Sequence, residues 1–207
     1  MLSYKTVEPH TLELLKHIMA EPLFSDMRLV GGTALALQYG HRQSVDLDIF
    51  GSMPQDEEVM EERLSSIGDL HVIKNSERIR IYSLDKIKVD FVDYSRYPWI
   101  DEPIVDGNIR LASSRDIAAM KINAAEGRGT KKVFIDIYFL LQHYSLCDIL
   151  DFYSQKYPEY SKFRALMSLT YFEDAEDQLM PKMFKHVSWE TVKKGIDKAV
   201  KNYRDVE

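Results

Sequence analysis

The chain has 207 residues, a formal net charge of −6 and one cysteine, Cys147. Its 45% hydrophobic and 29% charged residues are typical of a folded protein, and the length suits two small coupled subdomains. One cysteine excludes an internal disulfide and a multi-cysteine zinc site. Because it lies in an apolar helical pattern, we expect a buried, inert thiol. No apolar run reaches the roughly 18 to 20 residues of a membrane span, and no signal-peptide core follows Met1. We therefore predict a cytoplasmic protein without membrane contact.

The acidic charge balance argues against a protein that coats nucleic acid through its overall field. A local basic groove stays open, because lysine and arginine gather in residues 115–132 and 182–201. For the second cluster we favour solvated helix faces. Aromatic residues such as Tyr138, Phe139 and Trp189 have helical spacing, which favours core packing over base-stacking platforms.

The first half of the chain mixes predicted helices and strands. Hydrophobic periodicity predicts helices over residues 9–19, 33–39 and 57–64, strands over residues 27–30 and 45–50, and a hairpin of residues 78–84 and 87–94. Gly40 should close the second helix. Two prolines and Gly107 mark residues 96–108 as a surface connection.

The second half is predicted to be helical. Ser113 and Asp116 resemble a helix cap, and the helix they open should break at Gly127. Further helices are expected over residues 134–141, 145–157, 158–170 and 189–203. Strands followed by helices imply an α+β fold, in which a mixed-sheet core of residues 1–112 precedes a helical subdomain of residues 113–207.

Two adjacent glycines follow the strand of residues 27–30. Gly31 and Gly32 let the backbone turn sharply and approach a ligand closely, and the amides of the next helix then point at an anion. A nucleoside triphosphate fits such a turn. On its own, however, Gly-Gly before a helix is equally explained by close packing.

Three aspartates form the candidate metal site. Asp46 and Asp48 project from one face of a predicted strand with Cα atoms roughly 6.6 Å apart, while Val45, Leu47 and Ile49 should face the core. Alternation in the later strand places Asp90 on the face opposite Val89 and Phe91. Three oxygen ligands suit Mg²⁺ or Mn²⁺ and an in-line phosphoryl displacement. Like charges about 4 Å apart repel by roughly 4 kcal/mol at an effective dielectric of 20, so such a cluster needs a cation or a proton.

The order strand, Gly-Gly, helix, Asp-Leu-Asp and later aspartate resembles the polymerase-β-type nucleotidyltransferase superfamily. Residues 31–37 (GGTALAL) and 41–48 (HRQSVDLD) resemble more narrowly the AbiEii/AbiGii-type branch, known as toxins of type IV toxin–antitoxin systems. The resemblance extends to Lys121 and to residues 128–138, and spans roughly residues 10–143. Where the family often has Lys-Asp, this chain has Lys132 and Val133.

The resemblance implies a site that lies between the two subdomains. It assigns the nucleotide phosphates to Gly31, Gly32 and Thr33, the metals to Asp46, Asp48 and Asp90, a triphosphate contact to Lys121, and the orientation of the basic helical cluster to Asp136. It also implies a nucleoside triphosphate donor, an RNA acceptor such as tRNA, and a cognate antitoxin. From their place before the aspartates, Arg42 and Ser44 are further candidates for a phosphate or base, although a loop arginine is as often simply exposed.

The reaction expected of this site is attack of an acceptor hydroxyl on the α-phosphate, with Asp90 helping to deprotonate the hydroxyl. Two alternatives stay open. The acidic charge balance favours a small molecule or a protein side chain as acceptor over a long RNA. A non-catalytic regulator that retains the fold is disfavoured, because every residue of the motif is present.

Overall fold

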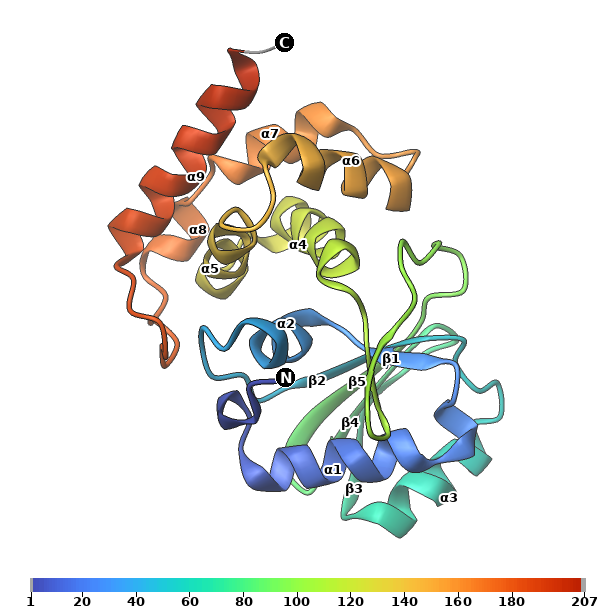
Figure 1. Ribbon diagram of the computed structural model, residues 1–207. Helices are drawn as coiled ribbons and strands as arrows, with labels where there is room; N and C mark the ends of the chain where they lie inside the picture. The colour runs from blue at the N-terminus through green and yellow to red at the C-terminus, as the bar shows by residue number, and fades with distance from the viewer. Residues whose placement is uncertain (1, 206–207) are drawn as a thin grey trace. The chain divides into compact units, whose positions relative to one another are not determined.

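The computed structural model describes residues 2–205, which form two compact units (Figure 1). The sheet unit comprises Met1–Tyr97 and Glu102–Ala112. The helical unit comprises Pro98–Asp101 and Ser113–Glu207, so a short segment of the predicted core belongs to the helical unit instead. Among the residues described, no helix combines the length and the apolar character that a bilayer crossing requires.

The sheet unit is built on seven strands in the order β3-β4-β5-β2-β1-β7-β6. Their bounds are β1 Met27–Leu29, β2 Leu47–Gly51, β3 Leu70–Asn75, β4 Ile79–Leu84, β5 Ile87–Asp93, β6 Ile104–Asp106 and β7 Ile109–Leu111. The pairs β1 with β7 and β2 with β5 are parallel, whereas the other neighbours are antiparallel. The predicted α+β class with a mixed sheet is confirmed.

Three helices accompany this sheet, namely α1 (Pro9–Ala20), α2 (Gly31–Tyr39) and α3 (Glu57–Ile67). Helices α1 and α3 cover one face (Figure 1), and the alternating side chains of β2 and β5 fill the core beneath them. Tyr82 of β4 reaches Glu61 of α3, and its ring meets Phe91 edge-on. The predicted hairpin is confirmed, with a turn in which Asp85 and Lys86 have φ of 51° and 67°, as tight hairpins require.

Three strands escaped the sequence prediction. Strands β6 and β7 pair across Gly107, so the interpretation of residues 96–108 as a plain surface connection was wrong at its end. Strand β3 is the sheet edge and leaves both Val72 and Ile73 exposed, with a register shift beside them. Because neither face of β3 is buried, its sequence lacks the alternation that reveals a strand.

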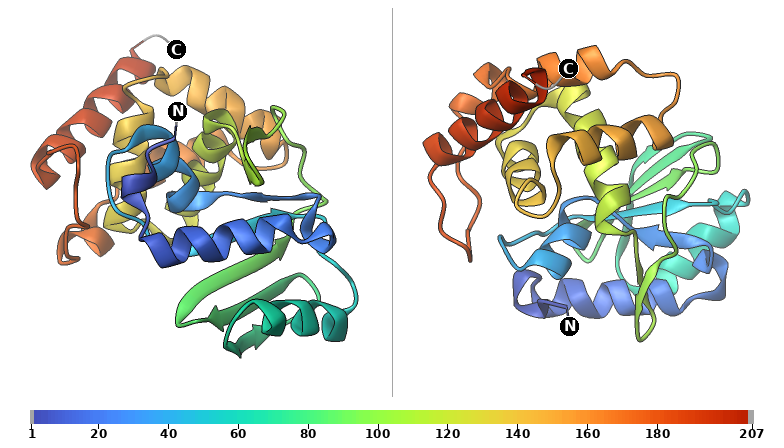
Figure 2. Two further views of the ribbon diagram at one scale, coloured as in Figure 1. Left: turned by 60° about the horizontal axis from the view of Figure 1, so that its bottom comes forward. Right: turned by 45° about the horizontal axis from the view of Figure 1, so that its top comes forward.

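The helical unit contains α4 (Ser114–Arg128), α5 (Lys131–Leu140), α6 (Leu146–Lys156), α7 (Lys162–Leu169), α8 (Glu173–Glu176) and α9 (Trp189–Arg204). Helix α4 contacts α5, α6 and α7, and α9 packs on α5, α6 and α7 (Figure 2). Val192, Ile196 and Val200, each four residues apart, form the buried stripe of α9. Cys147 is exposed, which corrects the expected buried thiol; Leu146, Ile149 and Leu150 take the core positions of α6.

Candidate active site

The glycine turn brings a carboxylate to the start of α2. Gly31 has φ of +68°, in the left-handed region that favours glycine. A Cβ at this position would lie 3.0 Å from Cγ of Asp48 and would collide with its Oδ2. The backbone amide of Val30 also donates to the Asp48 carbonyl at 2.8 Å. Only glycine therefore lets the Asp48 carboxylate rest against the first residue of α2.

Asp48 and Asp90 are direct neighbours on the parallel strands β2 and β5. Their Cα atoms are register partners, so both side chains leave the same face of the sheet, on strands roughly 4.8 Å apart. Leu47, Ile49, Val89 and Phe91 are fully buried on the other face. The predicted common face of these two aspartates is confirmed.

The third aspartate lies just outside the strand. Strand β2 begins at Leu47, so Asp46 precedes it, and Val45 is 46% exposed instead of facing the core as predicted. The fully buried hydroxyl of Thr33 donates to the Asp46 carbonyl and lies 2.9 Å from Oγ of Ser44. Thr33 and Ser44 therefore hold the backbone beside Asp46, a positioning contact that the sequence did not reveal.

Arg42 lies beneath the glycine turn and is only 2% exposed, unlike the exposed loop arginine that we weighed. Its guanidinium donates to the Gln43 carbonyl at 3.0 Å. A Cβ on Gly32 would collide with Nη2 of Arg42, so the guanidinium occupies the space that a side chain would fill. Gly32 and Arg42 are thus mutually dependent, and the cation lies against the backbone of the turn.

Asp90 has one satisfied and one unsatisfied oxygen. Oδ2 forms an ion pair with Nζ of Lys88 at 2.6 Å, whereas Oδ1 is buried and has no hydrogen-bond partner in the part of the chain described. A buried acceptor without a donor costs about 1 to 3 kcal/mol. A divalent cation bound by Asp48 and Asp90 would satisfy this oxygen, and carboxylate oxygens are the ligands that Mg²⁺ and Mn²⁺ prefer.

The described residues form only part of a metal site. Within residues 2–205, no three His, Cys, Asp or Glu side chains are already grouped so that they could hold a metal ion. The pair Asp48 and Asp90 is aligned by register, and Asp46 adjoins it in the chain. Phosphate oxygens and water commonly complete a magnesium site that has few protein ligands, so two aligned carboxylates fit this chemistry.

Lys121 and Asp136 form a nearly buried ion pair in the helical unit. Nζ of Lys121 lies 2.7 Å from Oδ2 of Asp136, which confirms that Asp136 lies near Lys121. The Asp136 side chain is completely buried, so any effect on a ligand must pass through Lys121, whose side chain retains 11% exposure. The contact between Lys121 and a triphosphate stays a prediction.

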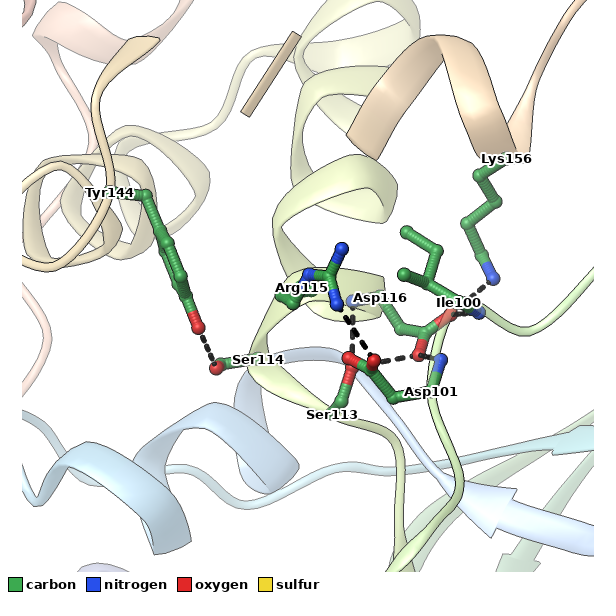
Figure 3. A network of polar contacts seen from close by, with 8 residues as sticks. All are labelled: Ile100, Asp101, Ser113, Ser114, Arg115, Asp116, Tyr144 and Lys156. Atoms are coloured by element: carbon green, nitrogen blue, oxygen red, sulfur yellow. Dashed lines mark hydrogen bonds and ion pairs between the residues drawn. The ribbon is translucent and has the colours of Figure 1, made fainter. Parts of the chain in front are cut away.

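A second buried carboxylate, on Asp116, went unrecognised except as part of a helix cap. It accepts from the amides of Ile100 and Asp101, the Ser113 hydroxyl and Nζ of Lys156, the last at 2.7 Å (Figure 3). Both charged side chains are completely buried. The network holds Pro98–Asp101 in the helical unit, and no local sequence signal pairs residues 40 positions apart.

Comparisons with known proteins agree with this geometry. The family described as "Nucleotidyl transferase AbiEii toxin, Type IV TA system" matches residues 13–204. A protein of Aquifex aeolicus (strain VF5), described as uncharacterized protein aq_aa25, is 32% identical over 197 residues, which cover 92% of this chain and 94% of the relative.

Two solved structures share the fold. MenT4, nucleotidyltransferase toxin Rv2826c from Mycobacterium tuberculosis H37Rv, has a TM-score of 0.59 at 13% identity, covering 97% of this chain and 87% of its own. JHP933 from Helicobacter pylori has a TM-score of 0.57 at 18% identity, covering 96% and 94% of the two chains. The predicted polymerase-β-like nucleotidyltransferase fold is confirmed.

Proposed function

We propose that this chain, which belongs to the AbiEii family of nucleotidyltransferase toxins, transfers a nucleoside monophosphate from a nucleoside triphosphate to RNA. The observation that carries the proposal is the buried, unpartnered Oδ1 of Asp90 next to the Asp48 carboxylate. A fold tolerates such an arrangement when a ligand completes it. The ligand of choice is Mg²⁺ or Mn²⁺ together with the triphosphate, and Asp46 is the third candidate ligand.

The glycine turn supplies the phosphate contacts in this proposal. Helix α2 begins at Gly31, and its first amides, including that of Gly32, are free of intrahelical partners by position. Such amides bind phosphate through their direction and the helix dipole. The buried guanidinium of Arg42 adds positive charge directly behind the turn, and Thr33 and Ser44 fix the loop that carries Asp46.

The chemical step follows from these placements. The acceptor hydroxyl attacks the α-phosphate, its bond to phosphorus forms as the bond to the bridging oxygen breaks, and pyrophosphate leaves. In this proposal Asp90, whose Oδ2 is paired with Lys88, also helps to deprotonate the hydroxyl. A bound divalent cation would stabilise the negative charge that develops on the phosphates. Lys121, held by Asp136, is proposed to contact the triphosphate.

The biological setting that we propose is the cytoplasm, where nucleoside triphosphates and RNA are both available. Addition of a nucleotide to the end of an RNA such as tRNA would remove that RNA from use, which accounts for a toxic effect. A cognate antitoxin protein would then limit the activity. The RNA acceptor and the antitoxin partner are proposals that go beyond the family membership.

A transfer assay tests the proposal directly. The protein is incubated with each of the four α-labelled triphosphates, Mg²⁺ or Mn²⁺ and total cellular RNA, and labelled RNA, protein and small molecules are then separated. We expect label in RNA for a preferred triphosphate. Label confined to protein or to small molecules would identify that fraction, and not RNA, as the acceptor. No label in any fraction would favour the non-catalytic regulator.

A matched pair of variants on β5 connects activity with the site. Asp90→Asn removes the charge beside Asp48, whereas Asp93→Asn makes the same change three residues later on the same strand, beside Gly51. We expect transfer to fall by about 10²-fold or more for Asp90→Asn, as for the loss of other groups that act on the transition state. Equal activity of the two variants would contradict the assignment of Asp90.

A further inference from the structure

A cavity of about 730 Å³ lies entirely within the helical unit. Its walls come from the end of α5, the connection to α6, the first turn of α6 and one face of α9. This volume lies in the range of sites that bind small molecules and nucleotides. No residue of the candidate active site lines the cavity, so any ligand that it binds lies apart from those residues.

Small residues on α9 create the space. Gly195 and Ala199 lie one helical turn apart and line the cavity. The ring of Tyr138 rests against Gly195, where a Cβ would lie 2.7 Å from the ring. Larger residues at these two positions would close the cavity between α5 and α9.

The cavity has a positive rim. Lys194, Lys198 and Asn202 follow one another at intervals of four residues along α9, and no aspartate or glutamate lines the cavity. Among the residues described, neither lysine has an ion-pair partner, whereas the adjacent Lys193 pairs with Glu176 and Glu190. In a chain of net charge −6, this local balance favours an anionic ligand.

Three tyrosines, Tyr138, Tyr144 and Tyr203, supply planar walls. The Tyr144 hydroxyl lies 2.7 Å from the Ser114 hydroxyl at the start of α4, which holds its ring in place (Figure 3). Tyr138 is half-buried and lines the cavity, which corrects its interpretation as plain core. Lys194 and Lys198 are exposed, as expected of a solvated helix face, and both line the cavity.

We infer that this cavity binds an unpaired segment of RNA, with a base against the tyrosines and phosphates along the lysine row. Stacking on aromatic rings beside basic residues is how proteins hold single strands without sequence preference. The row from Lys194 to Asn202 extends about 12 Å along the helix, which is longer than one phosphate needs and suits a chain of nucleotides. The inference rests on RNA as the proposed acceptor.

Binding is measured separately from transfer. The full chain is titrated, without triphosphate or metal, into a 5′-labelled single-stranded RNA hexamer, and fluorescence anisotropy gives Kd at several salt concentrations. We expect Lys198→Glu to raise Kd by about tenfold and to reduce the salt dependence, because a phosphate contact is lost. Lys201→Glu makes the same charge change on an exposed residue of α9 outside the cavity, and should leave Kd within about twofold.

Cys147 provides a second readout, because this single thiol is exposed and lines the cavity. The RNA hexamer should slow its reaction with a maleimide, and Ala199→Leu, which fills the cavity, should abolish this protection. Thermal melting confirms that each variant is folded. Equal protection by a mononucleotide, or tighter binding of an acidic hexapeptide than of RNA, would overturn the inference.

Failure of this inference and failure of the proposed function give different results. Asp48→Asn should bind the hexamer like the wild type, because Asp48 belongs to the sheet unit. If RNA is labelled in the transfer assay but Lys198→Glu binds the hexamer normally, the cavity assignment is wrong and the function stands. If Lys198→Glu loses binding but no RNA is ever labelled, the proposed acceptor is wrong and the cavity assignment stands.

Discussion

Two carboxylates, Asp116 of the helical unit and Asp90 of the sheet unit, have opposite surroundings. Asp116 of the helical unit accepts from two backbone amides, a hydroxyl and a buried lysine. Asp90 of the sheet unit has a lysine on one oxygen and no donor on the other within the described chain, and a second carboxylate, Asp48, is its register partner. From this difference we propose that Asp116 serves folding and that Asp90 binds a ligand.

The energetic logic of the two sites is correspondingly different. A buried ion pair with all hydrogen bonds made is broken only at high cost, because removal of one partner leaves an uncompensated charge. Asp90, whose Oδ1 lacks a donor among the residues described and whose register partner is a second carboxylate, already carries part of that cost in the folded state. Mutations should therefore separate stability from activity at the two sites, and the predictions below test this contrast.

The largest effect is expected for Asp48→Asn. The change keeps the shape of the side chain but removes a charge that attracts Mg²⁺, so nucleotide transfer should fall by roughly 10² to 10³-fold. Without metal, the melting temperature should hold or rise slightly, because repulsion between Asp48 and Asp90 is relieved. Transfer assays and thermal melting with and without Mg²⁺ measure both quantities.

The opposite outcome is equally well defined. If Asp48 were a structural residue that accepts hydrogen bonds from buried donors, the asparagine variant would lose about 1 to 3 kcal/mol of stability without metal. A clear loss of metal-free stability with intact transfer would contradict the active-site assignment. Mg²⁺ should also raise the melting temperature of the wild type more than that of the variant.

The helical unit should behave in the reverse manner. Lys156→Met leaves the Asp116 carboxylate buried without its cation, and we expect a loss of about 3 to 5 kcal/mol in the free energy of unfolding. Nζ of Lys156 also donates to the Pro98 carbonyl at 2.8 Å and lies over the Trp99 ring. Denaturant unfolding measures the loss, and transfer per folded molecule should change little.

A comparison with a second buried lysine of this unit, Lys121, sharpens the result. Lys121→Met breaks a similar pair with Asp136, but we propose that Lys121 also contacts the triphosphate. When the two variants are assayed at equal concentrations of folded protein, Lys121→Met should therefore raise KM for the triphosphate, whereas Lys156→Met should not. If both variants change KM equally, Lys121 has no special role in nucleotide binding.

Two of the glycines with left-handed backbone in the sheet unit, Gly31 and Gly107, provide a smaller effect and a matched control. Gly31→Ala meets both an unfavourable φ of +68° and a collision with the Asp48 carboxylate, whereas Gly107→Ala meets a φ of +59° and open space. Backbone strain alone costs about 1 to 2 kcal/mol. Gly107→Ala should lose that much stability in thermal melting and Gly31→Ala at least as much, but only Gly31→Ala should also lose transfer.

The sequence predicted the elements whose two faces differ. Asp90 was placed correctly because its strand alternates between buried and half-buried residues, and the hairpin was marked by two β-rich runs separated by only two residues. The edge strand β3 was missed because neither of its faces is buried, and the short pair β6 and β7 was missed because two prolines and Gly107 marked residues 96–108 as a connection.

The candidate site likewise has features that the sequence predicts and features that it does not. The Gly-Gly turn and the register pair Asp48 and Asp90 depend on local spacing and strand alternation, which a sequence displays. The ion pair of Asp116 with Lys156 and the burial of Arg42 depend on contacts that only the folded chain creates. Long-range pairing of this kind leaves no mark in local propensity, so the pair of Asp116 and Lys156 went unrecognised, whereas the family resemblance correctly placed Asp136 near Lys121.

The smallest effect concerns two buried tyrosine hydroxyls, one in each unit, at alkaline pH. Burial, reinforced by Glu61, raises the pKa of Tyr82 to about 12, and burial together with the hydrogen bond to Glu126 raises the pKa of Tyr153. An unfolded tyrosine has a pKa of about 10, so the folded state retains these protons to higher pH than the unfolded state. The resulting stabilisation is complete below pH 10 and is lost as the pH rises towards 12.

Melting temperatures at pH 7, 9 and 11 should therefore fall only in the last step, and Tyr82→Phe or Tyr153→Phe should each reduce that fall. A rise in melting temperature between pH 9 and 11 that the variants remove would contradict the raised pKa values, because the folded state would then release these protons before the unfolded state.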